Sequence, residues 1–151
     1  MGAKGKLVVG QEFFPSKGDI FHQLLKNNPH AFSTSSPQII QGCVVHEGEF
    51  GKPGSVIFWN YTHDGKERVA KEVIEAVDDE KKLISLRVIG GDILDEYKEF
   101  LLTFHVEESN DGKELATWTF EYETLNDDVG PPFSLIQLAF AMIVDVEKAQ
   151  P

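Results

Sequence analysis

The sequence predicts an α+β fold in which helices cover one face of an antiparallel β-sheet. Apolar residues recur at helical spacing in two regions, which lie towards opposite ends of the 151-residue chain. Between them, short runs alternate apolar and polar residues and are separated by glycine, aspartate and asparagine, as strands and turns are. Helices that are segregated from strands along a chain are typical of α+β folds.

Length and composition indicate one domain that spans residues 1–151. A chain of this size buries roughly 68–70% of the surface that its unfolded form exposes, and hydrophobic residues make up 41% of it. No apolar run approaches the ~20 residues of a membrane-spanning helix, so we expect no integral membrane association. With 25 acidic and 14 basic residues, the chain is expected to be repelled by nucleic acid.

The single cysteine, Cys43, can form no internal disulfide. The N-terminal segment also lacks the apolar stretch of a secretory signal. Both observations predict a reducing compartment, the cytosol.

The N-terminal third predicts one strand and two short helices. Residues 4–14 are rich in valine and phenylalanine and form the expected first strand. A helix follows, and Asn27-Asn28-Pro29 ends it. Residues 30–36 leave room for a second, very short helix. The apolar face of the first helix consists of Ile20, Phe21, Leu24 and Leu25.

Six further strands are expected in the middle of the chain, which gives seven in total. Between two of them, Asp64-Gly65 is a typical two-residue hairpin turn. The six strands are residues 39–47, 55–61, 67–77, 83–89, 97–106 and 115–123.

A long helix is expected to close the chain. It starts after Pro131 and Pro132, covers residues 133–148 and has about four turns. Its apolar stripe is wider than a surface helix requires, so we expect it to lie across an apolar surface.

Three consecutive strands present such a surface, and it is rich in aromatic residues. Alternation along the strands puts these side chains on one face. The face consists of Ile84, Leu86 and Val88, then Phe100, Leu102, Phe104 and Val106, and finally Ala116, Trp118, Phe120 and Tyr122. A bent sheet around one long helix encloses volume that side chains need not fill. Because periodicity cannot reveal a void, a solid core and a ligand cavity both stay open on this pattern.

Four segments resemble those of a known protein family, and their order and spacing match over essentially the whole chain. They read IQGC and HEGEFGKPGS at 40–43 and 46–55, DGKE at 64–67, GGDI and YK at 90–93 and 97–98, and WTFEYE and DDV at 118–123 and 127–129. This ordered set resembles plant major latex-like proteins, a branch of the birch-pollen-allergen superfamily, pathogenesis-related class 10.

The resemblance implies the helix-grip fold, a seven-stranded antiparallel sheet wrapped around a long C-terminal helix, with two short helices after the first strand. It also implies an internal cavity for a hydrophobic or amphipathic small molecule, such as a fatty acid, lysophospholipid, sterol or plant hormone, and a role in plant defence or stress response. Ligand cavities typically measure ~300–1,000 Å³. We expect a monomer or weak dimer that needs no cofactor and no metal.

The resemblance orients residues 55–61, which the pattern leaves open, with Ile57, Trp59 and Tyr61 pointing inward. The expected cavity wall on the sheet is then Ile40, Ile57, Trp59, Tyr61, Ile84, Leu86, Val88, Phe100, Leu102, Phe104, Trp118, Phe120 and Tyr122. The long helix is expected to add Phe133, Ile136, Phe140 and Ile143. Hydroxyls of Tyr61 and Tyr122 could be polar groups in this apolar wall.

Two further residues are candidates for contact with the ligand's polar end. Lys52 lies in the glycine-rich loop and offers a point charge to a carboxylate or phosphate, which favours a lipid as the ligand. His22, on the first helix, either lies near the cavity mouth and pairs with an acidic ligand or is a solvated helix histidine.

Catalysis is the alternative to binding. Weakly ribonucleolytic members of the superfamily carry a lysine two residues after the hydroxyl that Ser55 matches, but Ile57 stands there. Condensing members use a buried lysine from the long helix, whereas the lysine here, Lys148, is at its end. We therefore expect no dedicated enzyme. A weak isomerase, cyclase or ribonuclease that uses Tyr61, Tyr122 or a histidine of the same cavity stays open.

Overall fold

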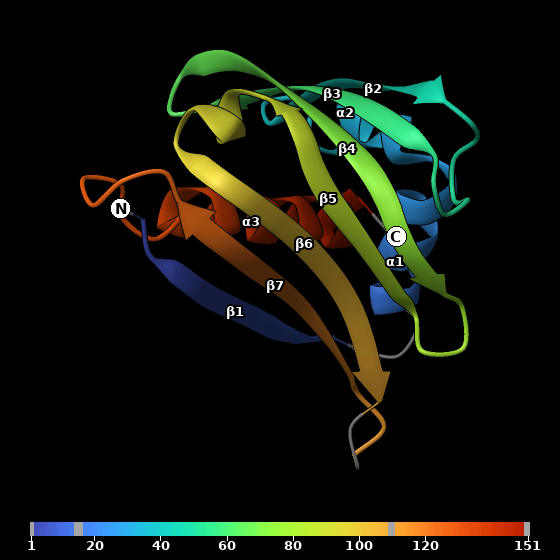
Figure 1. Ribbon diagram of the computed structural model, residues 1–151. Coiled ribbons are helices and arrows are strands. Elements are labelled where there is room, and N and C mark those ends of the chain that lie inside the picture. The colour runs from blue at the N-terminus through green and yellow to red at the C-terminus, as the bar shows by residue number, and fades with distance from the viewer. Residues whose placement is uncertain (1, 14–16, 109–110, 150–151) are drawn as a thin grey trace.

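The computed structural model describes residues 2–13, 17–108 and 111–149. Within these ranges, a seven-stranded antiparallel sheet has the order β1-β7-β6-β5-β4-β3-β2. It curls around a long helix (Figure 1), which confirms the predicted fold class. The strands are β1 (Lys4–Phe13), β2 (Ile40–Glu47), β3 (Val56–His63), β4 (Lys66–Asp78), β5 (Leu83–Gly91), β6 (Tyr97–Glu108) and β7 (Glu114–Thr124). Phe14, predicted as the end of the first strand, lies outside the described residues.

The hairpin between β3 and β4 fixes which side chains of these strands share a face. His63 pairs with Lys66 across a two-residue turn, and both turn residues have positive φ, 53° at Asp64 and 75° at Gly65. This is the predicted type of hairpin. The register that follows places Trp59 opposite Ala70 and Ile57 opposite Glu72.

The helices lie against the concave face of the sheet. They are α1 (Lys17–Asn27), the 3₁₀ turn η1 (Pro29–Ala31), α2 (Phe32–Ser35) and α3 (Phe133–Ala149). The ring of Phe21 on α1 packs 4.6 Å from that of Phe104 and 5.1 Å from that of Phe32, centroid to centroid. The Ser36 hydroxyl donates to Asp145 Oδ2 at 2.5 Å, which joins the end of α2 to α3.

One element was not predicted. The 3₁₀ turn η2 (Asp92–Asp95) connects β5 to β6, where the sequence indicates only a turn. A single 3₁₀ turn is too short to show a periodic pattern. Gly91 precedes it with φ 99°, a conformation that favours glycine.

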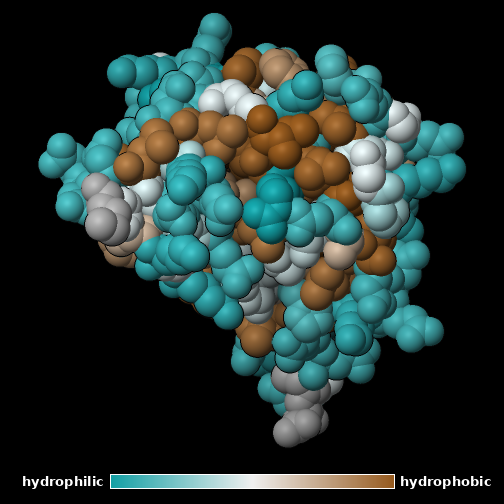
Figure 2. All heavy atoms as spheres, in the orientation of Figure 1, coloured by the Kyte–Doolittle hydropathy of each residue, from teal (hydrophilic) through white to brown (hydrophobic). Residues whose placement is uncertain are grey.

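The core lies between the sheet and the helices. Ile84, Leu86 and Val88 on β5 and Phe100, Phe104, Trp118 and Phe120 on β6 and β7 are buried, as the alternation predicts. Figure 2 shows hydrophilic residues around the periphery of one face and a band of hydrophobic residues across its middle. Among the described helices, none is long and apolar enough to cross a membrane.

Candidate functional site

A small cavity lies between the concave face of the sheet and α3. Its volume is about 80 Å³, room for a few water molecules and well below the ~300–1,000 Å³ of typical ligand pockets. The expectation of a large void is therefore wrong for this conformation. Trp59, Trp118, Phe100 and Phe120 all line the space, so aromatic rings form part of its wall.

Eight of the predicted wall residues line this cavity. They come from five strands, as expected for the inner face of a curled sheet. They are Ile40, Trp59, Tyr61, Leu86, Phe100, Leu102, Trp118 and Phe120. The same lining includes eight residues that were not predicted: Leu25, Ala70, Glu72, Ile93, Leu135, Leu138, Ala139 and Met142.

Seven predicted wall residues pack around the cavity without lining it. Phe104 is covered by Phe21 of α1, and the Tyr122 ring packs 5.7 Å from that of Tyr97. Phe21 and Tyr97 therefore cover two positions of the aromatic face. The seven are Ile57, Ile84, Val88, Phe104, Tyr122, Ile136 and Ile143.

The predictions for Phe133 and Phe140 are corrected. Phe133, the first residue of α3, is 58% exposed because it precedes Leu135 by two residues and therefore lies on another side of the helix from the cavity wall. Phe140 is half-buried and does not line the cavity, whose helical wall is formed by Leu135, Leu138, Ala139 and Met142. The wide apolar stripe of α3 did not reveal which of its edges faces the void.

Lys52 lies outside the cavity. Its side chain is 68% exposed, and Nζ is 2.8 Å from Glu49 Oε2 of the same loop. The loop closes on itself, since the Glu49 N–H donates to Ser55 Oγ at 3.0 Å. Lys52 belongs to the β2–β3 connection, whereas the cavity is lined from Trp59 and Tyr61 further along β3.

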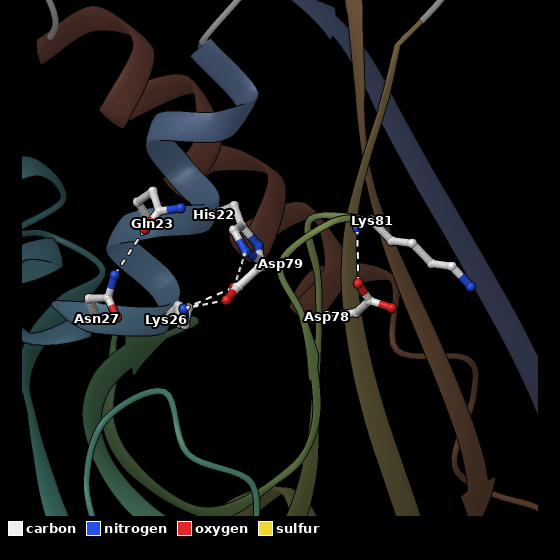
Figure 3. A network of polar contacts seen from close by, with 7 residues as sticks. All are labelled: His22, Gln23, Lys26, Asn27, Asp78, Asp79 and Lys81. Carbon is white, nitrogen blue, oxygen red and sulfur yellow. Dashed lines mark hydrogen bonds and ion pairs between the residues drawn. The ribbon is translucent and has the colours of Figure 1, made fainter.

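His22 is neither solvated nor at the cavity lining, and its side chain is completely buried. Its Nε2 lies 3.8 Å from Asp79 Oδ1, and Lys26 Nζ lies 2.8 Å from the same oxygen (Figure 3). The Lys26 hydrogen bond is the main cause that lowers the pKa of Asp79, with a smaller contribution from His22. These contacts join α1 to the turn between β4 and β5.

Glu72 is the unexpected polar residue of the cavity. It is 4% exposed and accepts a hydrogen bond at Oε1 from Trp59 Nε1 at 2.7 Å. Burial raises the pKa of Glu72 to about 7, and the bond from Trp59 opposes this rise. A signal for this position existed, because the Asp64-Gly65 turn sets Glu72 opposite Ile57, which the family resemblance orients inward.

A second, polar depression adjoins the cavity and is called the outer pocket here. It has a volume of about 380 Å³ and shares Tyr61, Ile93 and Leu135 with the cavity. Its ionisable residues are Asp64, Asp92, Asp95, Glu96 and Asp128, with Arg68 and His63.

Hydrogen bonds across the outer pocket hold its rim together. The Tyr97 hydroxyl donates to the Gly130 carbonyl at 2.9 Å, and His63 Nε2 lies 2.8 Å from Ser134 Oγ on the first turn of α3. Burial, with smaller effects of Asp92 and Glu72, raises the pKa of Tyr61, which therefore stays a neutral phenol. Tyr61, Ile93 and Leu135 thus lie between an apolar cavity and an acidic outer pocket.

Comparison with known proteins agrees with this architecture. Residues 13–149 match the pathogenesis-related protein Bet v 1 family. MLP-like protein 34 of Arabidopsis thaliana is 45% identical over 129 residues, which are 85% of this chain but 41% of that protein. The chain thus spans under half of that relative's length.

Solved structures extend the comparison. Ginseng major latex-like protein 151 from Panax ginseng has a TM-score of 0.91 and 39% identity, with 98% of this chain and 99% of that one covered. A truncated norcoclaurine synthase from Thalictrum flavum has a TM-score of 0.69 at 18% identity, covering 94% of this chain and 92% of that one. The second likeness is one of fold alone.

Proposed function

Because this chain belongs to the Bet v 1 family, as its resemblance to major latex-like proteins predicted, we propose that it binds and carries a hydrophobic or amphipathic small molecule in the cavity. The ligand class comprises fatty acids, lysophospholipids, sterols and plant-hormone-like molecules, and the role is in plant defence or stress response. We place the carrier in the cytosol, as a monomer or weak dimer.

The observation that carries this proposal is the juxtaposition of an apolar cavity and a polar outer pocket that share Tyr61, Ile93 and Leu135. An amphiphile needs both environments, one for its apolar body and one for its polar end. Burial of the apolar body contributes roughly 25 cal/mol per Å², from which the cost of association is subtracted.

The size of the cavity sets a condition on binding. A space of about 80 Å³ is smaller than any of the proposed ligands, and a close-packed interior does not yield without rearrangement. Ligand entry therefore requires α3 or the lining rings to move outward. The ties at both ends of α3, from His63 to Ser134 and from Ser36 to Asp145, are the contacts that such a movement strains.

The experiment is a ligand panel read by fluorescence. The chain has two tryptophans, and both line the cavity, so tryptophan emission reports directly on occupancy. A ligand of the proposed class is expected to change the emission and raise Tm. A variant with Ala139→Trp, which fills the cavity, should fold and lose both responses. If no amphiphile changes the emission or the Tm of the wild-type protein, the proposal is refuted.

Glu72 favours one alternative, a weak enzyme that uses the same cavity. A buried carboxyl group with a pKa of about 7 is suited to general acid–base catalysis near neutral pH. Tyr61 lines the cavity beside it, whereas Tyr122 does not. Turnover of an isomerisable or condensable ligand that Glu72→Gln abolishes would support this alternative. Ligand binding with no turnover over hours at pH 5–9 would contradict it.

A further inference from the structure

The cavity contains one carboxyl group. Within the described part of the chain, Glu72 is the only acidic residue in a lining otherwise made of aliphatic and aromatic side chains and the phenol of Tyr61. A buried charged group without a partner is costly, so the presence of a carboxyl group in such a wall requires a physical explanation.

One of the two carboxyl oxygens of Glu72 has a hydrogen-bond partner in the protein. Oε1 accepts from Trp59 Nε1 at 2.7 Å, a contact between diagonal neighbours on β3 and β4. For Oε2, the described residues provide no hydrogen bond. A carboxyl group offers up to four acceptor sites, and Trp59 leaves one oxygen of Glu72 available to the cavity, held in a fixed orientation.

Among the described residues, no cation neutralises this group. Within the described residues, Glu72 has no ion pair, and its titratable neighbours include Cys43 on β2 and Tyr61 on β3. Burial raises the pKa of both neighbours, so both are neutral near pH 7. The complement of Glu72 must therefore come from water or from the ligand.

The chemistry of the complement follows from the carboxyl group. A hydroxyl both donates and accepts, so it pairs with Glu72 whether the carboxyl group is ionised or protonated. A ligand carboxylate would pair only with the protonated form of Glu72, and it would face like charge from the ionised form and in the outer pocket, where Asp64, Asp92, Asp95, Glu96 and Asp128 outnumber Arg68. A purely apolar ligand would leave Oε2 buried without a partner.

We propose that Glu72, oriented by Trp59, is the polar anchor of the cavity. It selects an apolar ligand that carries a hydroxyl group, and it disfavours ligands of the same skeleton that carry a carboxylate or no polar group. This inference rests on the proposed function and names the ligand class of the same site. It departs from the preference for a lipid with a carboxylate or phosphate, which depended on Lys52 as the cation.

The test uses three probes with one skeleton: 2-naphthol, 2-methylnaphthalene and 2-naphthoate. Their affinities for the full chain are measured by isothermal titration calorimetry at pH 7. The variants are Glu72→Leu, which removes the anchor, and Glu72→Gln, whose amide also pairs with a hydroxyl. Glu75→Leu is the matched control, since Glu75 is on the same strand but exposed and paired with Arg87.

The wild-type protein is expected to bind 2-naphthol about tenfold more tightly than 2-methylnaphthalene, as one buried hydrogen bond to an ionisable group provides. Glu72→Leu should abolish this preference by weakening 2-naphthol alone, while Glu72→Gln and Glu75→Leu retain most of it. If Glu72→Leu fails to fold, Trp59→Phe, which removes the orienting donor, should reduce the preference instead.

Three results would overturn the inference and leave the carrier function standing: equal affinity for the three probes, a preference for 2-naphthol that survives in Glu72→Leu and Trp59→Phe, or tightest binding of 2-naphthoate. A wild-type protein that binds none of the three, and that no member of the amphiphile panel stabilises, would overturn both.

Discussion

Replacing Glu72 with glutamine is expected to change the pH dependence of stability. In the folded protein, burial raises the pKa of Glu72 from 4.5 to about 7. Between these two values, the unfolded chain loses a proton that the folded chain keeps, so the free energy of unfolding falls as pH rises from 4.5 to 7. Each pKa unit corresponds to about 1.4 kcal/mol, so the loss amounts to about 3 kcal/mol.

Glutamine is nearly isosteric, still accepts from Trp59 through its amide oxygen, and does not titrate. The free energy of unfolding of Glu72→Gln, minus that of the wild-type protein, should therefore be about 3 kcal/mol larger at pH 8 than at pH 4. Any effect of the amide that does not depend on pH cancels in this comparison. Urea denaturation at a series of pH values measures the difference, with Glu75→Gln on the exposed face as control. A difference that does not vary with pH would refute the assignment of Glu72 as a buried acid.

Three more substitutions test the account. Ala139→Trp should lower the free energy of unfolding by about 1–3 kcal/mol through overpacking and abolish stabilisation by ligands, both read by thermal denaturation. Ser36→Ala removes the hydrogen bond to Asp145 and should cost about 1.5–3 kcal/mol in urea; a smaller loss would show that α2 does not hold α3. Lys52→Ala should change stability by under about 0.5 kcal/mol and leave ligand affinity unchanged in calorimetry, whereas weaker binding would return Lys52 to the site.

The fold was predictable where alternation is clean. Strands β5, β6 and β7 separate apolar from polar residues, so the inner positions of Phe100 and Phe120 follow from periodicity alone. Strand β3 is apolar on both sides, with Val56 and Ile57 both buried, and only the family resemblance oriented it. The long helix was placed correctly because prolines precede it and its apolar positions recur over four turns.

Strand β4 shows why the site was less predictable. Two of its three valines, Val69 and Val73, lie on the outer face, while Ala70 and Glu72 point inward. Hydropathy thus favours the wrong face. Counting back from the two-residue turn gives the right face once the family resemblance orients Ile57 inward, because the register is a geometric consequence of the hairpin. The cavity volume depends on how deeply α3 packs and on the rotamers of the lining rings, and neither leaves a periodic trace in the sequence.

The central claim is that an amphiphile occupies the space between the sheet and α3. Native mass spectrometry of the purified wild-type protein and of Ala139→Trp, prepared in parallel with and without the ligand panel, tests it most directly. We predict a near-stoichiometric adduct on the wild-type protein that is missing from the filled variant. Unliganded masses for the wild-type protein under every condition, or an adduct that the filled variant binds equally well, would contradict the claim.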